Sequence, residues 1–220
     1  MKKKMTAPSI LDSDFSVLGA TVKMLESEGA DFIHLDVMDG RFVPQITFGP
    51  KIISSIRPLT KLVFDAHLMI EKPEEQAENF IKAGCDIINF HEEACKSPSA
   101  LIDLIKKSGK KCGMTIKPGT PVDNILKYID RLDLILIMSV EPGYGGQAFM
   151  PEQLLKLEKL RGIIDSNSYD CLLEIDGGIK KENAGQACDA GADVLVAGSA
   201  FFSKPDPAAA LREFKKILEA

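Results

Sequence analysis

The chain has 220 residues, of which 45% are hydrophobic and 27% are charged, and its formal net charge is −5. This composition is enough for a sizeable core and excludes an intrinsically disordered chain. Charges of both signs leave no basic stripe for nucleic acid and no polybasic membrane anchor, and no apolar run approaches the length of a membrane span. We therefore expect a small-molecule partner, with no nucleic acid and no membrane.

The cysteines bear on the compartment. The chain has five of them, an odd number, without a C-x-x-C pair or zinc-ribbon spacing. Free thiols are typical of a reducing compartment, so we expect a cytoplasmic protein. We also expect it to form a homo-oligomer.

Strand-like and helical segments alternate along the whole chain. Apolar, β-rich runs begin near residues 5, 32, 62, 87, 112, 133, 171 and 194, and helical segments begin near 16, 49, 74, 98, 121, 151, 180 and 206. Gly29, Gly84 and Gly191 each close a helical pattern before such a run. They stand 55 and 107 residues apart, close to two and four multiples of about 27, a plausible length for one strand-helix unit.

Eight alternating units favour an α/β fold of the (β/α)8 TIM-barrel type over a doubly wound sheet. A dinucleotide-binding sheet would require a G-x-G-x-x-G turn after the first strand, and the chain has none there. No linker rich in Pro, Gly or Ser divides the chain. We therefore interpret residues 1–220 as a single (β/α)8 barrel domain.

Four polar residues fall at strand ends, where a barrel carries its chemistry. His34 and Asp36 stand two residues apart in one run and share a face, His67 lies near the end of the next, and Asp176 follows the seventh. Two imidazoles and two carboxylates predict one divalent metal ion, which could be Zn, Fe, Mn or Co. Each carboxylate can also transfer a proton, so Asp36 and Asp176 are the catalytic candidates.

Other residues share these inward faces. Met38, Met69 and Met138 fall at the mouth ends of strands, where they predict an apolar collar that excludes water, with plain core filling as the alternative. Asp65 and Glu174 share faces with His67 and Asp176. His91, beside two glutamates, is left open between the surface and a supporting position behind the ligands.

Glycine clusters follow the last three strands. Glycine lets backbone N–H groups approach an anion closely, and barrels commonly bind phosphate after strands seven and eight. No Lys or Arg lies in these clusters, so backbone dipoles would hold the anion. The predicted phosphate-binding residues are Gly143, Tyr144, Gly145, Gly146, Gly177, Gly178, Gly198 and Ser199.

Seven segments together resemble the ribulose-phosphate 3-epimerase family, over nearly the whole chain. They are APSIL (7–11), HLDVMDG (34–40), FVP (42–44), HLM (67–69), LIMSVEPG (136–143), GGQ (145–147) and EIDGG (174–178). The resemblance implies a barrel of the ribulose-phosphate-binding type that interconverts D-ribulose 5-phosphate and D-xylulose 5-phosphate in the pentose phosphate pathway.

The resemblance also implies residue roles. His34, Asp36, His67 and Asp176 would hold the metal, and Asp36 and Asp176 would be the acid and base. Ser9, His67, Asp176 and the glycine loops would bind substrate. Removal of the hydrogen at C3 would leave negative charge on the substrate oxygens, for which the metal would supply Lewis-acid stabilisation, and the second carboxylate would return a proton to the opposite face.

Small departures from the family pattern concern substrate preference rather than chemistry. Arg41 stands where the family often has His, Gln45 where Asn is common, and Asp12-Ser13 where Ser-Ala is usual. A D-allulose-6-phosphate 3-epimerase would share fold, metal and mechanism. A sugar-phosphate lyase usually has a lysine on an inward strand face, and Lys61 and Lys117 are not convincingly placed for that role. A non-catalytic phosphate-binding barrel would not need the four predicted ligands.

Overall fold

The computed structural model describes residues 3–218, so residues 1–2 and 219–220 of the expected domain lie outside the described residues. The described residues form eight strands, each beginning within one residue of its predicted start. The strands are β1 (Met5–Pro8), β2 (Phe32–Met38), β3 (Val63–Met69), β4 (Ile87–His91), β5 (Lys111–Ile116), β6 (Leu134–Met138), β7 (Leu172–Asp176) and β8 (Val194–Ala197).

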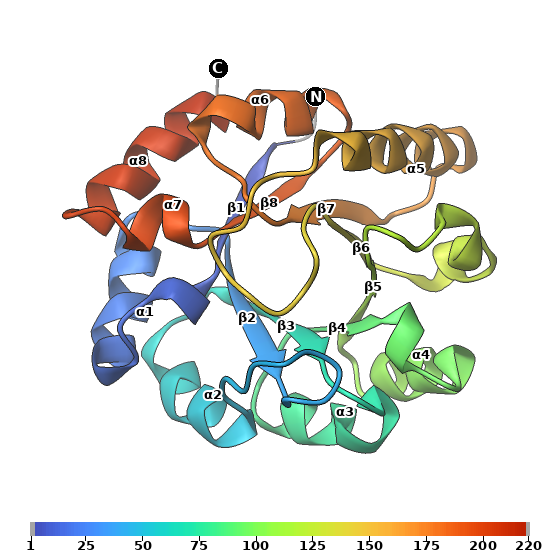
Figure 1. Cartoon of the computed structure of the whole chain (residues 1–220). Coiled ribbons are helices and arrows are strands. Elements are labelled where there is room, and N and C mark those ends of the chain that lie inside the picture. Colours follow the sequence, from blue (N-terminus) through green and yellow to red (C-terminus); the bar gives the residue numbers. More distant parts are fainter. Residues whose placement is uncertain (1–2, 219–220) are drawn as a thin grey trace.

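The strands form a ring with helices around its outside (Figure 1). Neighbouring strands follow the order β1-β8-β7-β6-β5-β4-β3-β2, and each paired neighbour is parallel. The ring nearly closes between β1 and β2, where Ser9 bridges His34 and the Asp31 N–H donates to the Thr6 carbonyl at 3.2 Å. The predicted (β/α)8 TIM barrel is confirmed.

The helices alternate with the strands along most of the chain, as predicted, and two of them follow β8. They are α1 (Leu18–Ser27), α2 (Pro50–Ile56), α3 (Pro73–Lys82), α4 (Pro98–Lys107), α5 (Leu154–Asn167), α6 (Lys181–Asp189), α7 (Ser199–Phe202) and α8 (Pro207–Leu218). Four of them begin at proline, which is suited to the first helical turn because an N–H group there would have no acceptor within the helix. The helical segment expected from residue 121 consists of two 3-10 helices, Val122–Asn124 and Leu126–Arg131.

Alternation along the strands separates two cores. On β2, Ile33, Leu35 and Val37 point outward and join the layer between strands and helices. Inside the ring, a smaller apolar cluster fills the barrel. Its buried members are Ala7, Phe32, Ile87, Leu134, Leu136, Met138, Val140, Val194 and Val196. The strands β2, β3 and β7 each also contribute two polar side chains to the interior, and β4 and β5 add the buried Asn89, His91 and Thr115.

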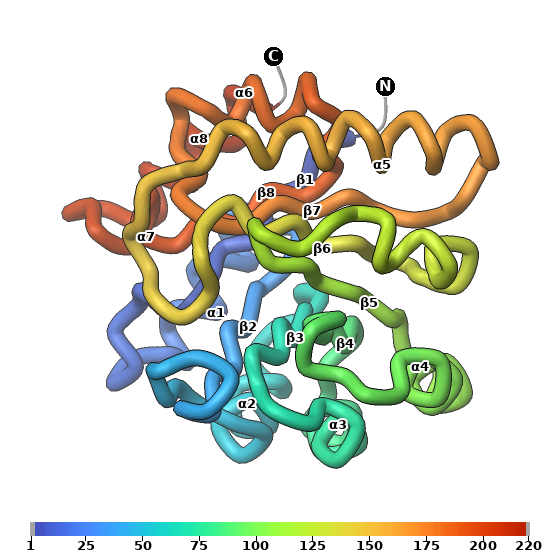
Figure 2. The backbone as a smooth tube through the Cα atoms, turned by 45° about the vertical axis from the view of Figure 1, so that its right-hand side comes forward, coloured from blue at the N-terminus to red at the C-terminus, as the bar shows by residue number. Residues whose placement is uncertain are grey.

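The loops that follow the strands gather at one end of the barrel (Figure 2). The loop after β6, drawn in yellow, crosses the mouth of the ring in Figure 1. None of the helices in residues 3–218 has the length and apolar character that crossing a bilayer requires.

Candidate active site and metal centre

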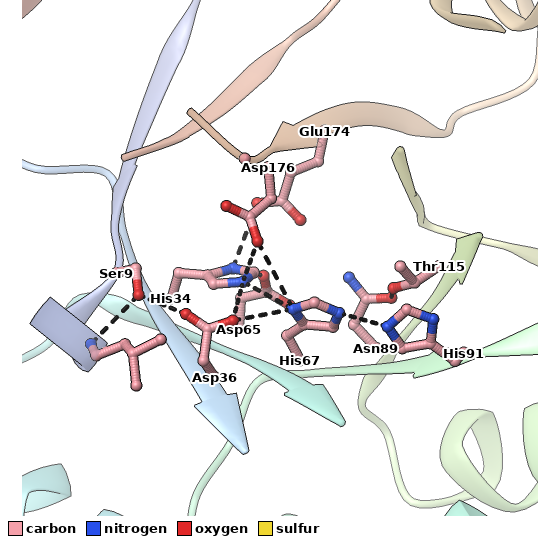
Figure 3. A network of polar contacts seen from close by, with 12 residues as sticks. Ser9, His34, Asp36, Asp65, His67, Asn89, His91, Thr115, Glu174 and Asp176 are labelled. Atoms are coloured by element: carbon pink, nitrogen blue, oxygen red, sulfur yellow. Dashed lines mark hydrogen bonds and ion pairs between the residues drawn. The ribbon is translucent and has the colours of Figure 1, made fainter. Parts of the chain in front are cut away.

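The four predicted ligands converge inside the mouth of the barrel (Figure 3). The β2–β3 register pairs Asp36 with His67, so side chains from both strands occupy one layer, and Asp176 approaches from β7. His67 Nδ1 lies 3.1 Å from Asp36 Oδ1 and 3.2 Å from His34 Nε2. Asp176 Oδ2 lies 4.0 Å from each of these nitrogens. Two nitrogens and two oxygens thus face a common point.

A chain of hydrogen-bonded groups fixes which nitrogen of His67 faces that point. Burial raises the pKa of Glu93, but hydrogen bonds from His91 and Thr120 outweigh it and lower the pKa to about 2. Glu93 is therefore a carboxylate that accepts from His91 Nδ1 at 3.2 Å. Burial lowers the pKa of His91 to about 4, so His91 is neutral and its Nε2 accepts the Nε2–H of His67 at 2.9 Å. Burial likewise lowers the pKa of His67, and its Nδ1 keeps a lone pair directed at the other donors.

His34 is oriented from the opposite side. Its Nδ1 donates to Asp65 Oδ2 at 2.7 Å, which leaves Nε2 facing the site. Burial lowers the pKa of His34, but the charges of Asp36 and Asp65 outweigh it and raise the pKa well above its usual value. Both nitrogens therefore carry protons unless a cation displaces the one on Nε2. Burial and the charge of Asp65 raise the pKa of Glu174, which holds its proton beneath the site.

The donor set fits a divalent cation. Tetrahedral coordination with bonds of about 2.1 Å places ligand atoms about 3.4 Å apart. The separations between the imidazole nitrogens and the carboxylate oxygens, 3.1 to 4.0 Å, bracket that value. Each imidazole also donates its remote N–H to a buried acceptor, as metal-binding histidines commonly do. The residues can therefore hold a metal ion.

The two carboxylates have opposite pKa shifts. Burial raises the pKa of Asp36, but the charge of His34 and its hydrogen bond outweigh this and lower the pKa. Ser9 also donates to Asp36 Oδ2 at 2.5 Å. Burial and the charge of Asp36 raise the pKa of Asp176 to about 7. Near neutral pH one carboxyl is thus ionised while the other can carry a proton, the pattern expected of an acid-base pair.

A cleft opens from the carboxylates to the loops. Ser9, Asp36, Asp176, the three methionines and all eight predicted phosphate-binding residues line it. His34 and His67 lie behind this lining and are fully buried. The methionines Met38, Met69 and Met138 are at most 4% exposed; Met38 and Met69 belong to one small apolar cluster, and Met138 belongs to the cluster inside the barrel. Tyr144 is 55% exposed at the rim.

Glycine allows two of the loops to touch. A Cβ added at Gly178 would lie 2.6 Å from the backbone nitrogen of Phe149 and 2.7 Å from the Gln147 carbonyl oxygen. Its φ of +65° is also in the left-handed region that favours glycine. The loop after β6 therefore rests directly on the loop after β7, and their backbones form one wall of the cleft.

Sequence reasoning left several supporting residues without a role. His91 is fully buried and stacks on His67 with ring centroids 5.0 Å apart, so of the two positions left open the surface is wrong. Asp65 and Glu174 lie on their predicted inward faces, beneath His34. Lys61 is exposed, and Lys117 Nζ lies 3.9 Å from the centroid of the Phe42 ring. Neither lysine lines the cleft.

A family model described as the ribulose-phosphate 3 epimerase family matches residues 5–202 of the chain. The chain belongs to this family. It is 50% identical over 212 residues to the ribulose-phosphate 3-epimerase of Synechocystis, covering 96% of this chain and 92% of that protein. It is 47% identical to the Bacillus subtilis enzyme, covering 95% and 97%, and 42% identical to the Escherichia coli K12 enzyme, covering 100% and 95%.

Solved structures of lower identity share the fold of this epimerase-family enzyme. A KGPDC from Streptococcus mutans is 15% identical with a TM-score of 0.74, covering 99% of this chain and 98% of that one. A 3-hexulose-6-phosphate synthase is 19% identical with a TM-score of 0.68, covering 98% and 99%. At these identities the likeness concerns the barrel alone.

Proposed function

We propose that the protein interconverts D-ribulose 5-phosphate and D-xylulose 5-phosphate with a divalent metal ion and two acid-base carboxylates. The observation that carries the proposal is the pair Asp36 and Asp176. These carboxylates come from strands β2 and β7, face one cleft beneath the glycine loops, and have opposite pKa shifts. Epimerisation needs two groups that work on opposite faces of one carbon, and this pair meets that need.

In this proposal His34, Asp36, His67 and Asp176 hold the metal ion. When bound, the ion supplies Lewis-acid stabilisation of negative charge on the substrate oxygens next to C3. The donor set of imidazoles and carboxylates accepts Zn, Fe, Mn or Co. The chain's contribution is to fix the ligands, since Asp65 orients His34 and the Glu93–His91 pair orients His67.

The carboxylates move the protons. Asp36, held as a carboxylate, takes the C3 proton of one epimer, and Asp176 delivers a proton to the opposite face. In the reverse direction the two exchange roles. Ser9 restrains Asp36 Oδ2 by its hydrogen bond, which limits rotation of the carboxylate. General acid or base catalysis of this kind contributes about 10²- to 10⁴-fold for each group.

The remaining cleft binds the rest of the substrate. The backbone of the loops after β6, β7 and β8 receives the phosphate, which fixes the position of C3 relative to the carboxylates. Met38, Met69 and Met138 exclude water from the carboxylates and so strengthen the charge interactions there. We also propose a cytoplasmic setting, because all five cysteines are unpaired thiols.

The experiment compares turnover of D-ribulose 5-phosphate and D-allulose 6-phosphate by the metal-replete protein. We expect kcat/KM to be at least about tenfold higher for the pentulose, or about 1.4 kcal/mol of transition-state discrimination. An equal or reversed preference would assign the protein to the hexulose phosphate. Turnover of neither sugar would refute the proposal.

A further inference from the structure

An acidic side chain of the chain itself lies among the glycine loops. Asp12 follows β1, in the 3-10 helix Ile10–Asp12, and lines the same cleft as the three glycine clusters. A Cβ added at Gly198 would lie 2.5 Å from Asp12 Oδ2, and one added at Gly145 would overlap Asp12 Oδ1. One carboxylate oxygen therefore rests against the loop after β8, and the other against the loop after β6.

The surroundings of Asp12 are those of a bound anion. The backbone of Ser199 hydrogen-bonds to its carboxylate, and no Lys or Arg is among the described residues that line the cleft. The nearby charged groups are themselves acidic, since Asp12 interacts with both Asp36 and Asp176. Asp12 is exposed at the mouth of the cleft, where partial desolvation and the charge of Asp36 raise its pKa and the Ser199 backbone partly offsets this. The Ser199 backbone is thus a stabilising partner of the Asp12 carboxylate.

We propose that the Asp12 carboxylate occupies part of the phosphate subsite, so that a phosphate dianion must displace it in order to bind. The inference rests on the proposed function, which places the phosphate at these loops. A phosphate at these loops competes with Asp12 for the space beside Gly145 and Gly198 and for the Ser199 backbone, and it also meets the charge of the carboxylate. Asp12 therefore weakens the binding of phosphate esters relative to a chain with an uncharged side chain at this position.

The test measures the dissociation constant of inorganic phosphate by calorimetry at about pH 8, without turnover. Asp12→Asn keeps the size of the side chain and removes its charge, whereas Asp12→Ser also vacates the space. We expect both variants to bind phosphate at least about tenfold more tightly than the wild type, or about 1.4 kcal/mol. The serine variant should bind at least as tightly as the asparagine variant.

Asp14→Asn is the matched control. Asp14 lies two residues away, is exposed and accepts from the Ser16 N–H at 2.8 Å, a capping role that asparagine retains. Its phosphate affinity should stay within about twofold of the wild type. Unchanged or weaker binding in both Asp12 variants would overturn the proposal, as would equal tightening in the control. Failure of the proposed function would appear separately. The protein would then not epimerise either sugar, although the Asp12 variants would still bind phosphate more tightly than the wild type.

Discussion

The substitution His91→Phe tests whether the buried chain behind His67 sets metal affinity. Phenylalanine keeps a flat ring between His67 and Phe42, whose centroids lie 5.0 and 4.7 Å from that of His91. It removes the nitrogen that accepts the His67 Nε2–H at 2.9 Å. His67 can then adopt the other tautomer, in which Nδ1 carries the proton and no longer presents a lone pair to a metal ion.

The size of the effect follows from that lost hydrogen bond. Leaving a buried N–H without a partner costs about 1 to 3 kcal/mol. Loss of a group that orients a metal ligand typically weakens metal binding by about 10- to 100-fold, which is about 1.4 to 2.7 kcal/mol. The two ranges agree. We therefore expect the dissociation constant of the metal to rise by about 10- to 100-fold in the variant.

The assay is competition for Zn²⁺ or Mn²⁺ with a chromogenic chelator, and excess metal should restore most of the activity. Thr115→Val is the control, because Thr115 pairs in register with His91 but its hydroxyl donates to Asn89 at 2.7 Å. Figure 3 shows Thr115 and Asn89 beside His91 and His67. A metal affinity equal to that of the wild type in His91→Phe would refute the reasoning.

Further outcomes follow from the same geometry. Purified protein should carry about one divalent ion per chain, and chelation should abolish activity without unfolding the barrel. His67→Ala should lose metal and activity together. Full activity in thoroughly metal-free protein would exclude the Lewis-acid role. Burial lowers the pKa of His91 from 6.5 to about 4, so the folded state binds fewer protons than the unfolded state between these values. His91 should therefore cost the chelated protein about 3 kcal/mol of unfolding free energy as the pH falls through that window, and denaturant titrations of His91→Phe should lack this loss. If residues 1–220 are one domain, those titrations should show one cooperative transition at neutral pH.

Much of the site could be predicted because it follows local rules. Alternation places His34 and Asp36 on one strand face, and the barrel fold brings the ends of β2, β3 and β7 to one mouth. The alternation of apolar runs and helical segments along the chain was sufficient to predict where each strand begins. None of these steps requires knowledge of which residues are neighbours across strands.

The supporting residues depend on just that knowledge. Asp65 stands beside His34 because of the β2–β3 register, and His91 reaches His67 from the end of β4. The position of Asp12 depends on how closely the loops after β6 and β8 approach it. Asp12 was identified from the sequence as a departure from the family pattern. The sequence alone does not show in which direction its carboxylate points.

The most direct test of the two-carboxylate account follows the C3 proton by NMR in D2O, with metal content measured on the same samples. The wild type should place deuterium at C3 of the product, because both carboxyl groups line the cleft and exchange their protons with solvent between turnovers. Asp36→Asn and Asp176→Asn keep the shape of the side chain and one oxygen ligand, so both variants should still bind metal. Each loses one proton-transfer group, so the metal-loaded samples should epimerise at least about 10²-fold more slowly than the wild type. Each variant should still exchange the C3 proton of one sugar slowly and without inversion, one variant acting on D-ribulose 5-phosphate and the other on D-xylulose 5-phosphate. If both metal-loaded variants epimerise at a rate near that of the wild type, Asp36 and Asp176 are ligands only, and the account is wrong.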